Sequence, residues 1–279
     1  MIDPRLTPAR GDVAAAKLKG QVEAKRFADG MVQQVRVGAS VLREAPSFSA
    51  RLETQLLYGE LFDVYDVDAD GWAWGQAHLD AYVGYARADS LDADLLESPT
   101  HRVAVLRTLV FPEPDKKSQP PSPLSLNAKL TVKAPLQNGF APLSRGGWVY
   151  AAHLALIDHV VSDWVASAER FVGLPYLWGG KDSSAVDCSG LVQTSLETGG
   201  VSAPRDADMQ EQSVGQAIAP NATLQRGDLA FWPGHVGIIR SPTELLHANA
   251  FHMQTVIEPL AAAVARLGAP RTIRRISAA

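Results

Sequence analysis

The sequence predicts an α+β protein in which a strand-rich first part precedes a domain of helices and antiparallel strands. Residues 31–95 hold five short apolar runs separated by turn residues, a pattern that favours a small β-barrel. Later in the chain, an apolar-periodic run that begins at Cys188 predicts a helix, and three short strand-like runs follow it. These observations place small β modules first and a mixed domain last.

The overall composition is that of an ordinary soluble globular protein. The chain has 279 residues, is 46% hydrophobic and carries a formal net charge of −4, and its length predicts about two domains. The mild acidity argues against nucleic acid and anionic membranes as partners. No apolar run approaches the ~18 residues of a membrane-spanning helix. The first residues contain no uninterrupted apolar segment before a cleavage site, so we expect a cytoplasmic protein without a secretory signal.

The N-terminal half divides into an arm and two β modules. Residues 12–29 are alanine-rich with interspersed charges and predict a short helix or an irregular arm. In the first module, strand-like runs at 61–67 and 71–75 flank an Asp-Ala-Asp-Gly turn, which is a hairpin signal. The predicted boundaries are 1–30 for the arm, 31–98 for the first barrel, 99–158 for the second and 159–279 for the last domain.

The second β module repeats the first in degenerate form. Residues 105–107 echo 41–43, and residues 148–156 echo 83–91 at nearly the same spacing. Between them lies a proline-rich loop, residues 111–123, which we expect to be extended and mobile. A plain surface insertion is favoured over a ligand for a proline-binding partner.

The last domain shows clear helix and strand signals. Residues 162–172 are amphipathic and stop at Gly173, and the helix that begins at Cys188 stops at Gly199. Strands are expected at 229–232, 235–240 and 243–248. Pro259 and Gly268 frame a late helix, and residues 272–276 predict a last strand.

Cys188 is the only cysteine of the chain, so it cannot form an internal disulfide. Its position in the first turn of a helix, after a loop rich in glycine, serine and aspartate, favours a reactive thiolate, because unpaired N–H groups and the helix dipole stabilise negative charge there. The alternative is a small buried residue at the helix start.

Two histidines beside strand-like runs are candidates for the base that a cysteine nucleophile needs. His235 lies in Gly-His-Val-Gly and His247 in Leu-Leu-His-Ala-Asn. Adjacent antiparallel strands would let His235 take the thiol proton while His247 holds the useful tautomer. The alternative for each is a structural core residue. No cluster has zinc-ligand spacing, so we expect no metal and no cofactor.

The order of the motifs resembles the NlpC-type bacterial cysteine peptidase family. The motifs are Pro-Tyr-Leu-Trp-Gly-Gly and Asp-Cys-Ser-Gly-Leu-Val within 175–192, Arg-Gly-Asp-Leu-Ala-Phe-Trp at 226–232, Gly-His-Val-Gly-Ile at 234–238 and His-Ala at 247–248. The resemblance covers roughly residues 160–279. It implies a papain-like domain with a Cys188, His235 and His247 triad, preceded by two bacterial SH3-like barrels.

The same resemblance implies a substrate site for a peptidoglycan stem peptide with a free N-terminal L-Ala. Glu60 and Asp187 would bind the ammonium group, Tyr176 would add its hydroxyl, and Ser189 would assist the Cys188 N–H at the oxyanion. Arg205 would meet a substrate carboxylate, although an ion pair with a neighbouring aspartate, Asp206 or Asp208, is an equal alternative. Asp187 as a helix cap, Glu60 as a solvated hairpin residue and Tyr176 as a loop packer are the structural alternatives.

The resemblance thus implies a cysteine endopeptidase that cuts the bond between γ-D-Glu and the diamino acid during cell-wall recycling. Two other classes stay open at this stage, an amidase or acyltransferase acting on another cell-wall amide, and a non-catalytic binder of wall peptides. The presence of all three triad residues argues against the binder. The preferred diamino acid and the oligomeric state are open.

Overall fold

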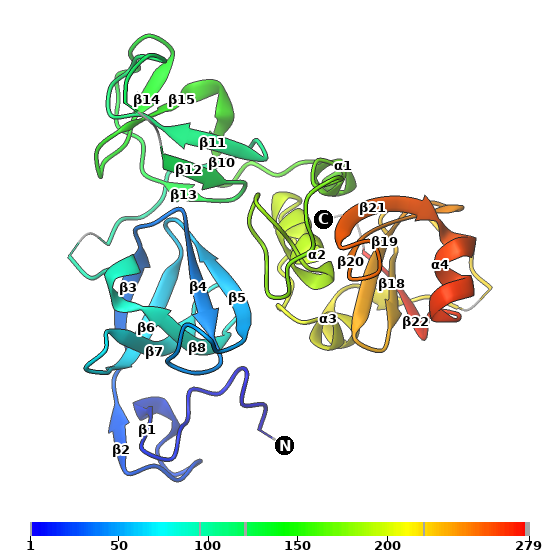
Figure 1. Cartoon of the computed structure of the whole chain (residues 1–279), viewed down its shortest axis with the longest axis horizontal. Helices are drawn as coiled ribbons and strands as arrows, with labels where there is room; N and C mark the ends of the chain where they lie inside the picture. The colour runs from blue at the N-terminus through cyan, green and yellow to red at the C-terminus, as the bar shows by residue number, and fades with distance from the viewer. Residues whose placement is uncertain (1, 95, 120–121, 220, 277–279) are drawn as a thin grey trace. The chain divides into compact units, whose positions relative to one another are not determined.

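The computed structural model describes residues 2–94, 96–119, 122–219 and 221–276. It divides the chain into two compact units, Met1–Ile157 and Asp158–Ala279, whose elements are labelled in Figure 1. Among these residues no helix is both long and apolar enough to span a membrane. Each unit has its own sheets, so each is described by itself.

The N-terminal arm is largely irregular, with two short strands and no α-helix in its described residues; of the two predicted forms, the irregular arm is the nearer. The strands β1 (Val13–Ala15) and β2 (Arg26–Ala28) pair in parallel, and the segment between them contains one 3-10 turn, η1 (Ala16–Leu18). The reason is tertiary packing: Val13 is fully buried in a cluster with Tyr65 and Trp74 of the following barrel. Burial of all three residues of β1 outweighs the helix propensity of the alanines.

The first barrel is a seven-stranded antiparallel sheet, with strand order β5-β4-β8-β7-β6-β3-β9. Its core holds apolar residues from most of these strands, including Leu42, Leu56, Phe62 and Ala86. The predicted hairpin is present, since β6 pairs with β7. Two strands, β5 and the short β9, were not predicted. The strands are β3 (Met31–Val35), β4 (Ala39–Arg43), β5 (Leu52–Leu57), β6 (Leu61–Val67), β7 (Trp72–Ala77), β8 (Val83–Arg87) and β9 (Leu91–Asp92), with the 3-10 turn η2 (Ala88–Ser90) before the last.

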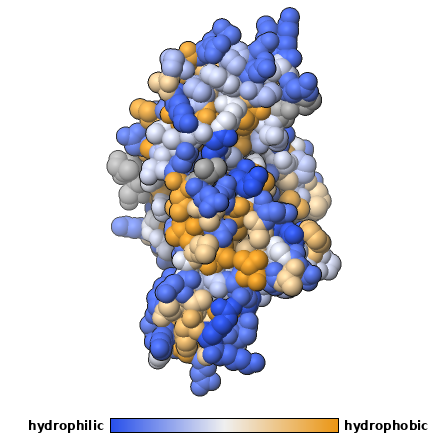
Figure 2. Space-filling model, turned by 90° about the vertical axis from the view of Figure 1, so that its left-hand side faces the viewer, coloured by the Kyte–Doolittle hydropathy of each residue, from blue (hydrophilic) through white to orange (hydrophobic). Residues whose placement is uncertain are grey.

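The face of the molecule that Figure 2 presents is mostly hydrophilic. Hydrophobic side chains gather near the middle of this face, and smaller hydrophobic groups lie above and below them. Met31 on β3 and Val67 on β6 are among the exposed apolar residues of the first barrel. The barrel therefore buries one side of its strands and leaves part of the other apolar.

The remainder of the first unit, up to residue 157, forms three small sheets in the described residues. A separate core of Val103, Leu124, Leu130 and Val149 holds them together. Strand β15 is followed by a 3-10 turn and β16, the same order as β8, η2 and β9; that the whole segment repeats the first barrel stays a prediction. The elements are β10 (His101–Val103), β11 (Arg107–Val110), β12 (Ser122–Ser125), β13 (Lys129–Leu130), β14 (Phe140–Pro142), β15 (Trp148–Tyr150), η3 (Ala151–His153) and β16 (Leu154–Leu156).

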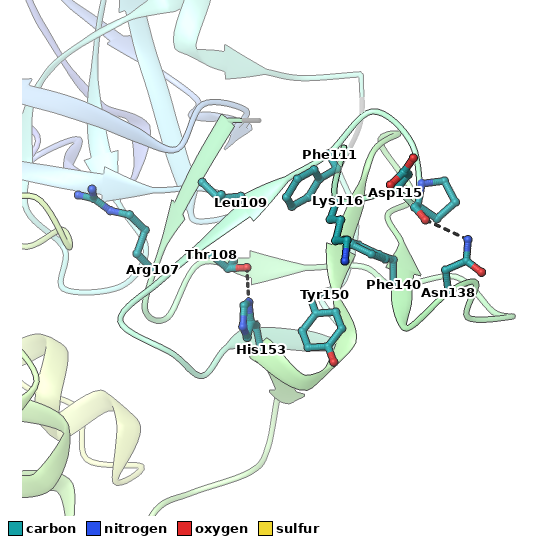
Figure 3. A pocket seen from close by; sticks show the side chains of 11 residues that line it. Arg107, Thr108, Leu109, Phe111, Asp115, Lys116, Asn138, Phe140, Tyr150 and His153 are labelled. Carbon is teal, nitrogen blue, oxygen red and sulfur yellow. Dashed lines mark hydrogen bonds between the residues drawn. The ribbon is translucent and has the colours of Figure 1, made fainter. Parts of the chain in front are cut away.

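The proline-rich loop lies beside a hollow of about 620 Å³ in this part of the chain. The loop connects β11 to β12, which pair with each other; its residues 120–121 lie outside the described residues. Figure 3 shows aromatic side chains along the hollow, with ring centroids 5.4 Å apart between Phe111 and Phe140 and 5.7 Å apart between Phe140 and Tyr150. None of the predicted catalytic residues lies in this unit.

The second unit carries a six-stranded sheet in the order β17-β22-β18-β19-β20-β21. Helix α2 packs against β19 and β20, and α4 packs against β20 and β21. The three predicted strands, the late helix between Pro259 and Gly268 and the last strand are all present. The elements are α1 (Trp164–Glu169), α2 (Cys188–Thr198), α3 (Ala207–Ser213), β17 (Gln216–Ala217), β18 (Leu229–Trp232), β19 (His235–Ser241), β20 (Glu244–Asn249), β21 (Gln254–Pro259), α4 (Leu260–Leu267) and β22 (Thr272–Arg275).

Candidate active site

Cys188 is the first residue of α2 and is 8% exposed. Asp187 caps the helix, because its Oδ1 accepts the Gly190 N–H at 2.7 Å. The residue two positions after the cysteine must be glycine: a Cβ on Gly190 would lie 2.1 Å from the Gly180 carbonyl oxygen. The Asp-Cys-Ser-Gly motif therefore seats the first turn of the helix against the preceding loop and presents the thiol at a fixed point.

The two predicted histidines form a hydrogen-bonded pair. His235 begins β19 and His247 lies on β20, and the distance between His235 Nε2 and His247 Nδ1 is 2.8 Å. The backbone N–H of Val236, the residue after His235, points to the Cys188 sulfur. The structure thus brings together the cysteine at the start of α2 and both histidines at the start of β19 and on β20.

Burial sets the protonation states of the Cys188 thiol and the His235 imidazole. Burial, followed by the charge of Asp187, raises the pKa of Cys188 to about 12, although the N–H groups of Val236 and Ser189 act in the opposite direction. Burial, followed by His247 and Arg266, lowers the pKa of His235 to about 3. Thiol and imidazole are therefore both neutral at rest. This corrects the expectation that the helix N-terminus holds a thiolate, because desolvation outweighs the helix dipole.

Asp187 and Arg205 form a buried ion pair next to the nucleophile. Arg205 is 1% exposed, and its two terminal nitrogens donate to the two carboxylate oxygens of Asp187 at 2.9 and 2.7 Å. Asp187 also accepts the Gly179 N–H at 2.7 Å, in addition to its capping bond. One carboxylate thus ties the loop before Cys188, the helix start and the segment that carries Arg205.

This geometry bears on three of the predicted substrate contacts. Arg205 is buried and bound to Asp187, so the cation next to Asp187 within the protein is Arg205. Ser189 Oγ accepts a hydrogen bond from Arg205 at 2.9 Å and donates one to Asp187 Oδ1 at 3.3 Å. The roles of Asp187, Ser189 and Arg205 toward a substrate stay predictions.

Tyr176 lies in the loop before the cysteine and is half-buried. Its N–H donates to the Met253 carbonyl at 3.0 Å. Burial first, and then the nearby Cys188 and Asp187, raise the pKa of Tyr176 above its usual value. That the hydroxyl of Tyr176 contributes to the substrate pocket stays a prediction.

Glu60 belongs to the first unit and is 2% exposed. Its Oε2 accepts the Leu57 N–H at 3.0 Å across the turn between β5 and β6, so it is not a solvated hairpin residue. Together with Gln34, His78 and Lys129, it lines a hollow of about 390 Å³ in that unit. Its role toward an ammonium group stays a prediction.

The sequence did not reveal two residues, Glu258 and Arg266, that extend the hydrogen bonds of the two histidines. Glu258, on the unpredicted strand β21, lies with its Oε1 2.7 Å from His247 Nε2. Arg266, in the last turn of α4, donates to both oxygens of Glu258, at 3.2 Å for Oε2. The available signal was a lone acidic residue inside the apolar run of residues 255–259, directly before the proline that starts the late helix.

Within the part of the chain that the structure describes, one group of side chains has the spacing of metal ligands. Atoms of His247, His252 and Glu258 lie within 4.8 Å of one another. However, Glu258 already binds the guanidinium of Arg266, and His252 Nδ1 lies 3.0 Å from the Asn249 carboxamide oxygen. A cation at Glu258 would face the positive charge of Arg266, so the donor set fits a hydrogen-bonded chain better than a metal centre.

Comparison with known proteins identifies two matching segments. Residues 173–265 match the NlpC/P60 family, and residues 42–91 match a family described as the bacterial dipeptidyl-peptidase Sh3 domain. These matches confirm the family resemblance and an SH3-like N-terminal region. That residues 99–158 form a second SH3-like barrel stays a prediction.

Full-length relatives agree with this assignment. A protein of Lysinibacillus sphaericus named dipeptidyl-peptidase 6 is 25% identical over 228 residues, which is 73% of this chain and 82% of that protein. A γ-D-glutamyl-L-lysine dipeptidyl-peptidase of Bacillus cereus is 25% identical over 239 residues, 75% of this chain and 71% of that protein. The crystal structure of an NlpC/P60 family protein from Bacillus cereus superposes with a TM-score of 0.75 at 22% identity, covering 88% of this chain and 99% of that one. The fold is therefore that of a papain-like NlpC/P60 domain with an SH3-like region before it.

Proposed function

We propose that this cysteine peptidase, whose catalytic domain belongs to the NlpC/P60 family, hydrolyses the bond between γ-D-Glu and the diamino acid of peptidoglycan stem peptides. That it is a cell-wall peptidase follows from the family; the bond and the form of the substrate are the proposal. The observation that carries it is the buried thiol of Cys188 at a helix N-terminus beside the hydrogen-bonded pair of His235 and His247.

The first half of the reaction forms an acyl-enzyme. His235 takes the proton of Cys188 as the sulfur attacks the γ-carbonyl carbon of D-Glu, so that charge develops only as the bond forms. The N–H of Cys188 at the start of α2 is the donor for the resulting oxyanion. His235 then gives its proton to the amine of the diamino acid, which leaves as the C–N bond breaks.

The second half restores the enzyme. Water gives a proton to His235 and adds to the thioester carbonyl. The C–S bond then breaks, and the proton returns from His235 to the Cys188 sulfur. The neutral resting pair suits this cycle, because the same imidazole must accept a proton twice and release it twice.

Two features support a substrate with a free N-terminal L-Ala. The relatives of Bacillus cereus and Bacillus subtilis are named as γ-D-glutamyl-L-lysine dipeptidyl-peptidases. An enzyme that releases dipeptides must recognise the free amine that lies two residues before the cleaved bond. Glu60 offers a carboxylate at the wall of a hollow of the first unit, and carboxylates bind ammonium groups through charge-assisted hydrogen bonds. We propose that Glu60, rather than Asp187, recognises the ammonium group.

A free amine also places the enzyme after other wall hydrolases. Stem peptides expose N-terminal L-Ala only once an amidase has released them from the sugar, so the proposed role is recycling of wall peptides in the cytoplasm. Accumulation of L-Ala-γ-D-Glu-diamino acid in the soluble fraction of cells that lack this protein would support that role. Accumulation outside the cells would contradict the cytoplasmic location.

The direct test is hydrolysis of L-Ala-γ-D-Glu-diaminopimelate and of its N-acetylated form. We expect wild type to release L-Ala-D-Glu from the free peptide only, and Cys188→Ala to release none. A Glu60→Gln variant should lose discrimination between the two forms through KM. Equal cleavage of both forms would remove the amine requirement. Attack on a different amide, detected by mass analysis of the products, would support the amidase or acyltransferase alternative.

A further inference from the structure

The hydrogen bond between His235 and His247 is part of a longer series that extends to the carboxylate of Glu258. Hydrogen bonds lead from His235 Nε2 to His247 Nδ1 at 2.8 Å, and from His247 Nε2 to Glu258 Oε1 at 2.7 Å. Arg266 holds Glu258 through both carboxylate oxygens. The guanidinium carbon of Arg266 in turn lies 4.3 Å from the centre of the Phe251 ring.

The sheet register explains why Glu258 reaches His247. In the antiparallel pair of β20 and β21, His247 faces Val256 and Leu245 faces Glu258. Glu258 is two residues from Val256, so it lies on the same face of the sheet and diagonally across from His247. Arg266 follows in the last turn of α4, which packs on β20 and β21. The anchor is therefore part of the same scaffold as the histidines.

The hydrogen bonds from His235 through His247 to Glu258 determine which ring nitrogen of each histidine carries a hydrogen. Burial would raise the pKa of Glu258, but hydrogen bonds from Arg266 and His247 outweigh it and the pKa lies below its usual value. The carboxylate only accepts, so Nε2 of His247 carries the hydrogen. Burial holds His247 neutral, which leaves its Nδ1 as an acceptor and places a hydrogen on Nε2 of His235. The lone pair of neutral His235 is then on Nδ1.

We propose that Glu258, held by Arg266, is a positioning residue that fixes the tautomers of His247 and His235 and so keeps Nδ1 of His235 free to accept the Cys188 proton. Glu258 contacts neither substrate nor sulfur in this role. The inference rests on the proposed use of His235 as the base, but its central claim concerns ring hydrogens and does not depend on which peptide is cut.

The informative change is Glu258→Gln. If the carboxamide oxygen turns to Arg266, its NH₂ group faces His247, and both histidine tautomers must reverse. That reversal places the hydrogen on Nδ1 of His235, which blocks the base. We expect kcat to fall by about 10- to 100-fold with KM within about twofold, by analogy with groups that orient a catalytic imidazole.

The matched control is Glu244→Gln on the neighbouring strand. Glu244 also pairs with an arginine, Arg240, at 2.7 Å, but among the described residues it makes no hydrogen bond to either histidine. Its loss should leave kcat unchanged. A second variant, Arg266→Gln, keeps the carboxylate and removes its anchor, and we expect a smaller loss of kcat in the same direction. If both Glu258→Gln and the control lower kcat equally, the inference is wrong.

Imidazole ¹⁵N NMR of the wild type tests the inference without any variant. Two-bond correlations should show Nε2–H for both His235 and His247, and a population with Nδ1–H in Glu258→Gln. Nδ1–H at His235 in the wild type would overturn the inference. The expected tautomers together with no hydrolysis of the tripeptide would instead reject the proposed substrate and leave this inference supported.

Discussion

Two carboxylate–guanidinium pairs serve the catalytic unit in different ways. Asp187 and Arg205 have side chains 9% and 1% exposed, and their hydrogen bonds also engage the Gly179 and Gly190 amides and the Ser189 hydroxyl. Glu258 and Arg266 have side chains 10% and 23% exposed, and the second partner of Glu258 is the imidazole of His247. Outside its arginine, Asp187 binds mainly backbone N–H groups. Glu258 instead binds the imidazole ring of His247, whose hydrogen it keeps on one nitrogen.

The two pairs show two separate effects that a buried carboxylate and its arginine can have near a nucleophile. A carboxylate bound to backbone amides and a guanidinium fixes the position of a loop and a helix start. A carboxylate bound to an imidazole fixes the position of a hydrogen. The first is expected to act on stability and the second on rate, and the following measurements test that division.

The largest expected effect is on activity, at the end of the histidine chain. His235→Ala removes the base and should lower kcat/KM by about 10⁴-fold or more, while the unfolding midpoint in urea stays close to that of wild type. His159→Ala, at an exposed histidine of the same unit, is the control. Retention of more than a tenth of the activity would show that another group takes the thiol proton.

The next effect is on stability, at the first pair. Arg205→Met leaves Asp187 buried without its cation and should cost roughly 3–5 kcal/mol of unfolding free energy. Arg226→Met, which removes half-exposed ion pairs with Asp163 and Glu169, should cost less than about 1 kcal/mol. Similar losses for the two variants in urea titrations would contradict a special role for the buried pair.

Alkylation of Cys188 reports the protonation state of the nucleophile. Because burial raises the pKa of Cys188 to about 12, the thiolate fraction rises about tenfold per pH unit throughout the range below that value. The rate with iodoacetamide should therefore keep rising between about pH 7 and 10, whereas a free thiol levels off above about pH 8.5. A rate that is flat from pH 6 upward would indicate a resting thiolate–imidazolium pair instead.

The smallest effect is a pH dependence of stability. The folded-state pKa of His235 is lowered from 6.5 to about 3, and that of His247 is also lowered, so the unfolded chain binds more protons below pH 6.5. Stability from the neutral imidazoles is present above pH 6.5 and is lost as pH falls toward 3, by at most about 1.4 kcal/mol per pH unit for each ring. His235→Asn should show a shallower loss in urea titrations between pH 6.5 and 5; an equal slope would contradict the burial argument.

Many of the local elements could be predicted from the sequence. The helix that starts at Cys188, the strands at 229–232 and 235–240, and the helix between Pro259 and Gly268 follow from periodicity and end signals, which are local properties. Strands β5, β9 and β21 and helix α3 were missed, because their residues show weaker periodicity and depend on neighbouring strands or helices for their burial. The two short strands of the arm were missed for the same reason.

What the sequence by itself determined is which residues are candidates for the chemistry: one cysteine at a helix start and two histidines beside strands, in the order of a known family. Only the tertiary structure decided their partners. Arg205 has Asp206 and Asp208 close by in the chain, yet it binds Asp187, and Glu258 meets His247 across two strands. Partner choice in a buried site depends on which groups the packed elements bring within hydrogen-bond distance, and sequence spacing does not contain that information.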